Sequence, residues 1–284
     1  MPVIKTLIYN DTRNFKIEYY TYGKETEYPV LFMHGSVPMP FSKELSDLIS
    51  ELNLYVIVIL RPGYGSSSRL EYKNIYEYAM LLKNFVTDLQ LKCFDVLGLS
   101  AGAPYCYALA AAYPNLVNKV NICSGIPLVN NKSIFHMNSR GDRFIFSLSK
   151  FLPAGIIGKY GLKAMEAQEK KKGWTDAECG ETMDVVFEKY VNPNWYGIGY
   201  STTLQYKYWG FDAETITNKV FIYHSKGDCL IPFHIAQNSA KLLKNSQVIE
   251  FETENHESEK IIFIAIGDIS KRFFLAPSIR HLCF

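Results

Sequence analysis

Strand-like apolar runs alternate with longer helix-patterned stretches through the first 127 residues, and this alternation leaves few architectures open to the chain. The runs lie at 29–33, 55–60, 94–98 and 120–123, after an alternating stretch at 15–22. The intervals between them leave room for helices at 41–52, 75–91 and 101–113. Continuous apolar strands are typical of sheets covered on both faces, and strands that alternate with helices form parallel βαβ units. We therefore predict an α/β fold with a doubly wound, mostly parallel sheet.

The alternation stops after Pro127 and resumes near residue 213. Residues 128–212 contain few β-branched runs and several helical stretches, and Thr175–Glu178 has the S/T-x-x-E form of a helix capping box. Strand and helix patterns then return at 219–225, 233–244, 247–252 and 257–274. We predict one core formed by residues 1–127 and 213–284, interrupted by a helical cap at 128–212.

Composition narrows the classes of function. The net charge of +2 argues against a nucleic-acid partner. The longest apolar runs, at 56–60 and 261–266, are far shorter than the roughly 18 residues of a membrane span, and the first residues show no secretory signal. Six scattered cysteines without metal-ligand spacing predict reduced thiols in the cytoplasm and no metal site. Nucleotide-binding glycine motifs are absent, so we predict no cofactor.

A G-x-S-x-G motif, Gly98–Gly102, lies between an apolar run and an alanine-rich helical pattern. A serine hydroxyl becomes a nucleophile when a base takes its proton, and it must also project where a substrate reaches it. A sharp strand-to-helix turn presents the side chain in this way, but only small residues fit two positions before and after. Ser100 is therefore the predicted nucleophile, with Gly98 and Gly102 as structural positions of the turn.

Several further motifs make the chain resemble an α/β-hydrolase fold enzyme of the general esterase and lipase group, over nearly its whole length. Met33–Ser36 resembles the HG oxyanion loop of that family, in which His34 and Gly35 are structural. Arg61–Ser67 resembles its RPGYGxS turn, and Tyr223–Asp228 resembles the HGxxD strand end that carries the acid. The resemblance implies a Ser-His-Asp triad.

In the family's chain order the acid and then the histidine follow the serine, which points to Asp228 and His256. His234 competes as the base, but it lies at the start of a helix six residues after Asp228. His224 lies inside the seventh predicted strand, and His136 and His281 lie in the cap and the tail. By the same resemblance, the backbone N–H groups of Ala101 and Ser36 form the oxyanion hole.

This set predicts a serine hydrolase that cleaves a carboxylic ester or thioester through an acyl-enzyme on Ser100, with a small-molecule ester as its partner. A serine rather than an aspartate as nucleophile argues against the dehalogenase and epoxide-hydrolase branches. A non-catalytic binding protein on the same fold and a perhydrolase or lyase using the same triad stay open as alternatives, and so does a homodimer.

Aromatic residues are abundant in the predicted cap. We expect some of them to line an apolar acyl pocket, with Phe146 and Trp195 as the named candidates. The alternative is that a small helical insertion uses such side chains for its own packing. The aromatic residues concerned are Phe144, Phe146, Phe151, Trp174, Trp195, Tyr196, Tyr200 and Trp209.

Overall fold

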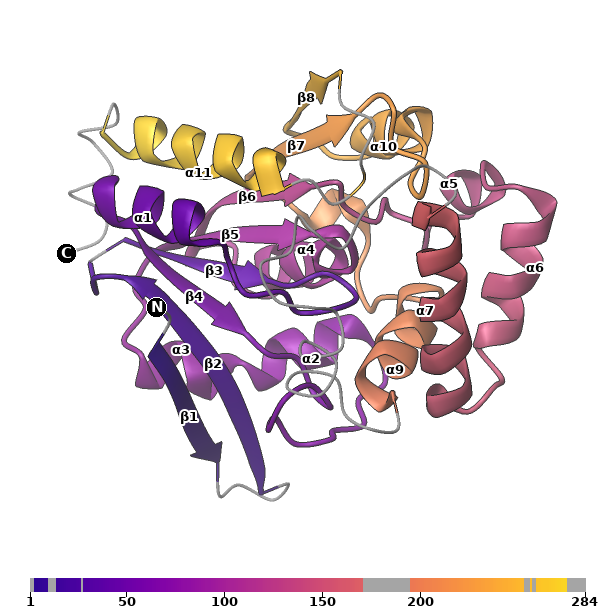
Figure 1. The fold of residues 1–284 in the computed structure, drawn as a ribbon, viewed down its shortest axis with the longest axis horizontal. Helices are drawn as coiled ribbons and strands as arrows, with labels where there is room; N and C mark the ends of the chain where they lie inside the picture. Colours follow the sequence, from indigo (N-terminus) through magenta and orange to yellow (C-terminus); the bar gives the residue numbers. More distant parts are fainter. Residues whose placement is uncertain are drawn as a thin grey trace.

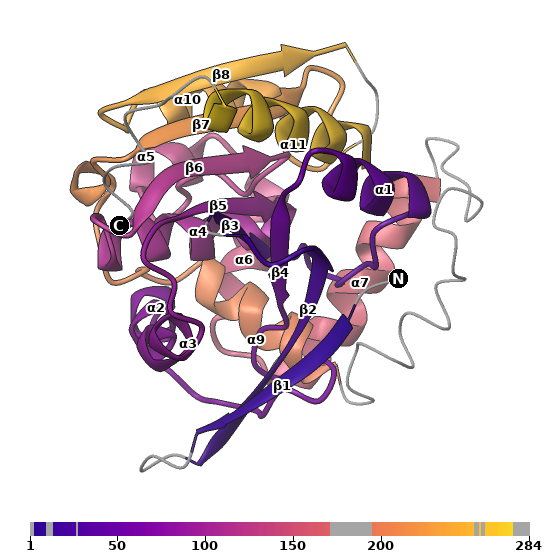
Figure 2. The ribbon, with the colours of Figure 1, turned by 90° about the vertical axis from the view of Figure 1, so that its left-hand side faces the viewer.

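The computed structural model describes residues 3–9, 14–26, 28–170, 195–252, 256 and 259–274. Eight strands form one sheet in the order β1-β2-β4-β3-β5-β6-β7-β8 (Figure 1). The strands are β1 (Val3–Tyr9), β2 (Phe15–Gly23), β3 (Pro29–Met33), β4 (Tyr55–Ile59), β5 (Phe94–Leu99), β6 (Val117–Cys123), β7 (Lys219–Ser225) and β8 (Ser246–Phe251). Strand β2 runs antiparallel to both neighbours, and β4, β3, β5, β6, β7 and β8 run parallel. The predicted doubly wound, mostly parallel sheet is confirmed, and Figure 2 shows its twist from β1 to β8.

Helices cover both faces of this sheet (Figures 1 and 2). Helices α1 (Lys43–Glu51) and α11 (Glu259–Phe274) lie on one face, and α2 (Ile75–Leu81), α3 (Lys83–Asp88), α4 (Ala103–Ala112) and α10 (Phe233–Ala240) lie on the other. Alternate residues of one strand therefore enter two separate cores, as Leu31 and Met33 do on one side and Val30 and Phe32 on the other. Burial on both faces explains why these strands read as continuous apolar runs.

Between β6 and β7 the chain forms α5 (Lys132–His136), α6 (Arg140–Ser149), α7 (Ala154–Lys170), α9 (Tyr196–Gln205) and the short 3₁₀ turn η3 (Ala213–Thr215). Helices α5, α6, α7 and α9 gather at the end of the molecule toward which β3 and β5 point (Figure 1). This arrangement places them beyond the carboxyl edge of the sheet. Of the helices that the structure describes, none combines the length and the apolar character needed to cross a bilayer.

Two local expectations differ from the structure. Strand β1 was not among the predicted strands, because its apolar residues Val3, Ile4 and Ile8 are exposed at the edge of the sheet. The predicted helix at 75–91 is two helices, α2 and α3, joined at Leu82. The predicted capping box at Thr175–Glu178 lies outside the described residues.

Candidate active site

Ser100 lies where β5 ends and the 3₁₀ turn η1 (Ser100–Gly102) leads into α4. Its φ of 48° is in the left-handed region, which costs a residue with a Cβ on the order of 1–3 kcal/mol. The turn holds because two glycines give it room: a Cβ on Gly102 would lie 2.0 Å from the Met33 carbonyl oxygen, and one on Gly98 would lie 2.8 Å from Cys106 Sγ. The predicted turn therefore exists, and it presses the residues after Ser100 against the end of β3.

The structure brings Ser100, His256 and Asp228 together in one hydrogen-bonded chain. Ser100 Oγ lies 2.9 Å from His256 Nε2, and His256 Nδ1 lies 2.7 Å from Asp228 Oδ2. All three side chains are buried, with Ser100 only 3% exposed. His234, the competing base, is exposed on α10. The geometry thus supplies an acceptor for the serine proton and a carboxylate behind it.

Asp228 is held as an anion. Its Oδ1 accepts the backbone N–H groups of Leu230 at 2.9 Å and Ile231 at 2.8 Å. Burial raises the pKa of Asp228, but hydrogen bonds and charge from His224 and His256 outweigh burial and bring the pKa well below its ordinary value. An ionised Asp228 accepts from His256 Nδ1, so the proton on the imidazole sits there and Nε2 is left free to accept from Ser100.

His224 is a site residue that the sequence analysis placed only inside a strand. It is completely buried at the end of β7, and its Nε2 lies 3.2 Å from Asp228 Oδ2 and 2.8 Å from the Ile231 carbonyl oxygen. Both neighbours of Nε2 are acceptors, so this nitrogen carries the proton and donates it. Nδ1 has no hydrogen-bond partner within the described part of the chain. His224 therefore ties the carboxylate to the loop that follows it.

The predicted oxyanion loop, His34–Ser36, is fixed by Arg61 and Tyr64 of the RPGYG turn. The buried guanidinium of Arg61 donates to the carbonyl oxygens of His34 and Gly35, and Tyr64 donates its hydroxyl to the Ser36 carbonyl at 2.9 Å. In a trans peptide the N–H points away from the carbonyl, so the Ser36 N–H points away from Arg61. Arg61 also lies over the ring of Tyr64, with 5.3 Å to its centroid.

His34 is a structural residue of this loop. Burial, together with the charge of Arg61, holds the pKa of His34 well below its ordinary value, so its ring is neutral. The Arg61 backbone N–H donates to His34 Nε2 at 3.2 Å, which places the ring proton on Nδ1, 2.8 Å from the Gly35 carbonyl. Arg61 was not among the predicted site residues; a cation at the end of a buried strand is the signal that indicates it.

Helix α9 packs directly on the turn at Ser100–Gly102, which we call the elbow. Gln205 is buried and donates from Nε2 to the Ala101 carbonyl at 3.2 Å, and Ser201 Oγ lies 3.0 Å from the Tyr105 hydroxyl. Trp195, at the start of α9, packs against the same buried cluster as Tyr64 and Leu99. Among the described helices of the predicted cap, α9 is therefore one that contacts the turn at Ser100.

The cap aromatics divide into two groups. Phe146 stacks on Tyr206 with 3.9 Å between ring centroids, and Trp209 is fully buried, 6.3 Å from the ring of Tyr107. Phe144 and Phe151, in contrast, are 68% and 85% exposed, so these two side chains face solvent. Trp174 lies outside the described residues.

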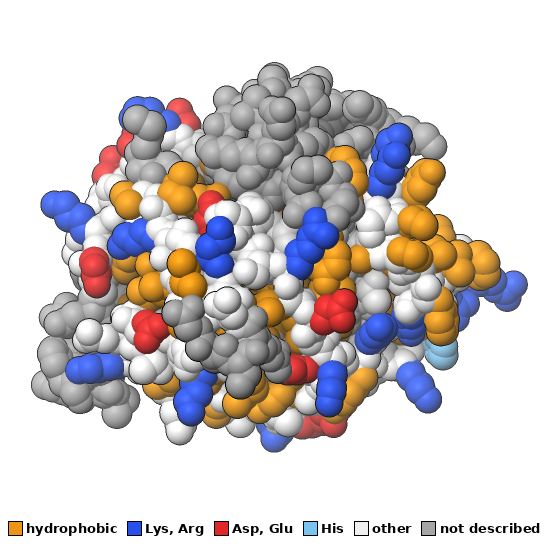
Figure 3. Space-filling view, turned by 90° about the horizontal axis from the view of Figure 1, so that it is seen from below, with side chains coloured by type: hydrophobic (Ala, Val, Ile, Leu, Met, Phe, Trp, Pro, Cys, Tyr) orange, Lys and Arg blue, Asp and Glu red, His pale blue; other side chains and the backbone are white. Residues whose placement is uncertain are grey.

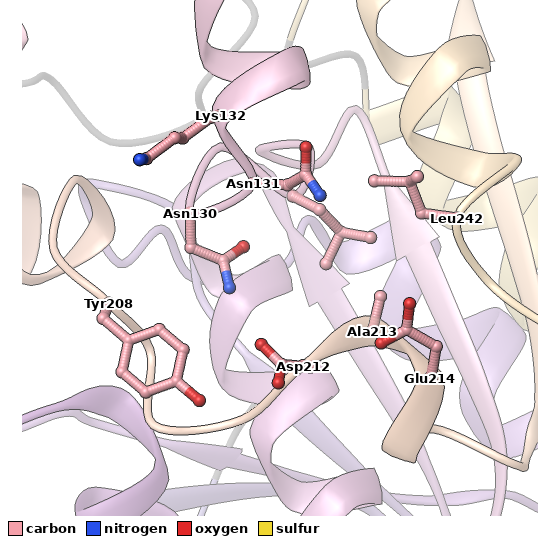
Figure 4. A pocket seen from close by; sticks show the side chains of 9 residues that line it. Asn130, Asn131, Lys132, Tyr208, Asp212, Ala213, Glu214 and Leu242 are labelled. Carbon is pink, nitrogen blue, oxygen red and sulfur yellow. The ribbon is translucent and has the colours of Figure 1, made fainter.

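A pocket of about 470 Å³ lies elsewhere, between the start of α5, the loop before η3 and the end of α10 (Figure 4). Its described lining is mostly polar and does not include Ser100, Asp228 or His256. The lining residues are Leu128, Asn130, Asn131, Lys132, Tyr208, Asp212, Ala213, Glu214 and Leu242. It lacks the groups that the predicted chemistry needs.

Comparison with known proteins gives many structural neighbours. An α/β hydrolase fold protein from Chitinophaga pinensis superposes with a TM-score of 0.67 at 16% identity, covering 98% of both chains. The esterase EaEST from Exiguobacterium antarcticum reaches 0.69 at 16% identity, with 95% of this chain and 100% of that chain covered. The haloalkane dehalogenase DbeA-M1 loop variant from Bradyrhizobium elkanii reaches 0.68 at 17% identity, with 98% and 100% covered. The chain has the α/β-hydrolase fold.

Sequence comparison adds one shorter likeness to this fold assignment. Over 110 residues the chain is 29% identical to the uncharacterized hydrolase YcgS of Bacillus subtilis (strain 168). The aligned segment covers 39% of this chain and 38% of that protein. No family model matches the chain. The α/β-hydrolase neighbours include both an esterase and a dehalogenase, so the choice between reactions depends on the side chains at the elbow.

Proposed function

We propose that this α/β-hydrolase is a serine hydrolase that cleaves a carboxylic ester through an acyl-enzyme on Ser100. The observation that supports it best is the buried chain Ser100 Oγ–His256 Nε2 and His256 Nδ1–Asp228 Oδ2, at 2.9 and 2.7 Å. These distances and this order are what a base-activated serine requires.

In the proposed reaction His256 Nε2 takes the Ser100 proton while Oγ forms a bond to the ester carbonyl carbon. The oxyanion that results is bound by the N–H groups of Ala101 and Ser36. The tetrahedral intermediate collapses as the alkoxide leaves and takes the proton from His256, which leaves an acyl ester on Ser100. Water then attacks this ester with His256 as base, and the acid is released. Asp228 stays ionised and stabilises the imidazolium throughout.

The identity of the nucleophile favours an ester over an alkyl halide, although a haloalkane dehalogenase is among the neighbours. A carboxylate that displaces a halide forms an ester, which water can cleave. A serine hydroxyl would instead form an ether on Ser100, and a base and an oxyanion hole give no route to hydrolyse an ether. The esterase of Exiguobacterium antarcticum shares this fold and supports the same choice.

The test of this proposal is hydrolysis of p-nitrophenyl esters by the full chain, with halide release from chloroalkanes as the competing assay. We expect ester turnover and no halide release. Halide release without ester turnover would favour dehalogenation, and tight ester binding without turnover would favour the non-catalytic alternative.

We further propose that residues 128–212 form a cap that selects substrates by the length of their acyl chain. Each methylene buried in an apolar pocket contributes about 0.8 kcal/mol, or roughly fourfold in kcat/KM. Activity should therefore rise with acyl length until the pocket is filled and then fall. Trp195→Ala is expected to move this maximum to longer chains while the acetyl-ester rate changes by less than about threefold.

Phe146→Ala is the companion variant because Phe146 packs inside the predicted cap on Tyr206. Tyr208→Ala, an exposed position of the same region, is the matched control. If kcat/KM of the parent protein did not change with acyl-chain length, the proposal that the cap selects by chain length would be contradicted. A loss of acetyl-ester and long-chain activity together in Trp195→Ala would mean that Trp195 supports the triad geometry instead.

We expect His224 to act as a positioning residue for Asp228. A hydrogen bond to a charged group contributes roughly 1.5–3 kcal/mol, so His224→Leu is expected to lower kcat by about tenfold or more with KM little changed. Activity at low pH is limited by the proton that His256 must lose before it can act as base. A carboxylate with one donor fewer stabilises the imidazolium of His256 more strongly, so the acid side of the pH–rate profile should move to higher pH.

His224→Gln is the matched variant, since its amide can still donate to the carboxylate. We expect it to recover most of the lost rate and to move the acid limb back. Equal losses in both variants with an unmoved acid limb would show that His224 contributes only to packing at the end of β7.

A further inference from the structure

Helices α6 and α7 carry an apolar surface that faces solvent. Three of its side chains lie on one face of α6, two lie in the turn that follows, and one lies in the first turn of α7. They are Phe144, Ile145, Leu148, Phe151, Leu152 and Ile156, and we refer to them as the α6–α7 patch. Orange side chains gather on the right of Figure 3, at the end of the molecule formed by these helices.

This patch is not needed to hold the two helices on the protein. Their inward sides already have partners: Phe146 stacks on Tyr206, and Ile157 is buried. Gly158 packs so closely on Trp195 that a Cβ there would lie 2.2 Å from its carbonyl oxygen. Single exposed apolar residues are ordinary, but six on adjacent turns mark a surface that contacts a partner or a membrane.

The charges around the patch indicate whether it contacts a protein partner or a membrane. Between residues 137 and 163 the chain carries five cations and one carboxylate, Asp142. The cations lie on α6, in the turn and on α7, and they are Arg140, Arg143, Lys150, Lys159 and Lys163. Phenylalanine and leucine beside lysine and arginine on one helical surface are typical of segments that rest in the interface of an anionic bilayer.

A second copy of this chain fits the surface less well. A two-fold interface pairs the same surface of both copies, so it would bring the five cations of one copy close to the five of the other, and like charges across an interface disfavour association. A membrane that contains anionic lipid offers both an apolar interior for the side chains and negative headgroups for the surrounding charges.

We propose that the α6–α7 patch docks this protein on an anionic lipid surface. The apolar side chains enter the headgroup boundary, and Lys159, Lys163 and their basic neighbours pair with lipid headgroups. This docking is independent of the reaction at Ser100, so a result that contradicts one proposal leaves the other unaffected.

The test is sedimentation of the full chain with vesicles of phosphatidylcholine, with and without phosphatidylserine. We expect binding to the mixed vesicles that weakens with added salt, and little binding to phosphatidylcholine alone. The double variant Phe144→Ser/Phe151→Ser should weaken binding by about tenfold or more. Lys159→Gln and Lys163→Gln should each weaken it by about fivefold.

Matched controls lie outside the α6–α7 patch: they are Ile8→Ser, at an apolar residue 65% exposed on β1, and Lys92→Gln, at an exposed lysine between α3 and β5. Both should bind vesicles like the parent, and all variants should keep the parent rate on a water-soluble ester. Absence of vesicle binding, or equal binding by Phe144→Ser/Phe151→Ser, would overturn the proposal. So would a dimer in light scattering that this double variant splits while no vesicles are bound, because the occupant would then be a second copy.

Discussion

Ser100→Ala is expected to lower kcat/KM on p-nitrophenyl acetate by about four to six orders of magnitude, because alanine leaves no group to form the acyl-enzyme. The fold should be unaffected, since the substitution removes one oxygen and leaves the backbone of the elbow in place. Steady-state kinetics together with thermal unfolding measure both effects.

Ser124→Ala provides a closely matched control for this prediction. Ser124 follows the neighbouring strand β6, is fully buried, and has φ of 45°, near the 48° of Ser100. Its hydroxyl has no hydrogen-bond partner among the residues that the structure describes. We expect the Ser124 variant to keep the parent rate within about threefold. Ester hydrolysis within tenfold of the parent in Ser100→Ala would contradict the assignment of the nucleophile.

His256→Ala is expected to lower kcat/KM by about as much as Ser100→Ala, because the two side chains act as one unit. The double variant should lose no more than either single one, a non-additivity that separate contributions would not produce. The measurement is kcat/KM for the two single variants and the double variant on the same acetyl ester.

His234→Ala is the control for the choice of base. His234 is exposed on α10, six residues after Asp228, so its removal should leave the rate within about threefold. A larger loss in His234→Ala than in His256→Ala would show that a different histidine takes the Ser100 proton.

The parts of the site that topology controls could be predicted from sequence. In a parallel sheet the carboxyl ends of the strands meet at one edge, so residues that follow β5 and β7 converge there whatever their separation along the chain. Ser100 and Asp228 lie at those ends. His256 follows β8, and the chain order that the resemblance supplied was enough to select it.

Contacts that depend on side-chain direction could not be predicted. His224 lies in a strand, where neither periodicity nor chain order indicates that its ring contacts the carboxylate of Asp228. The orientation of α6 is a similar case: its sequence contains Phe144 and Phe146 two positions apart, and only tertiary packing determines that Phe146 stacks on Tyr206 while Phe144 faces solvent. Strand β1 was not predicted because it is held by its pairing with β2 rather than by burial, and pairing leaves no pattern of buried apolar residues in the sequence.

Labelling with a fluorophosphonate, followed by mass spectrometry of the intact protein and its peptides, tests the central claim most directly. The probe forms a covalent bond only with a serine whose proton a base has taken, and it makes no assumption about the natural ester. The account predicts one adduct per chain, located on Ser100, formed by the parent and by Ser124→Ala and absent from His256→Ala. No adduct on the parent protein, or an adduct on another serine, would contradict it.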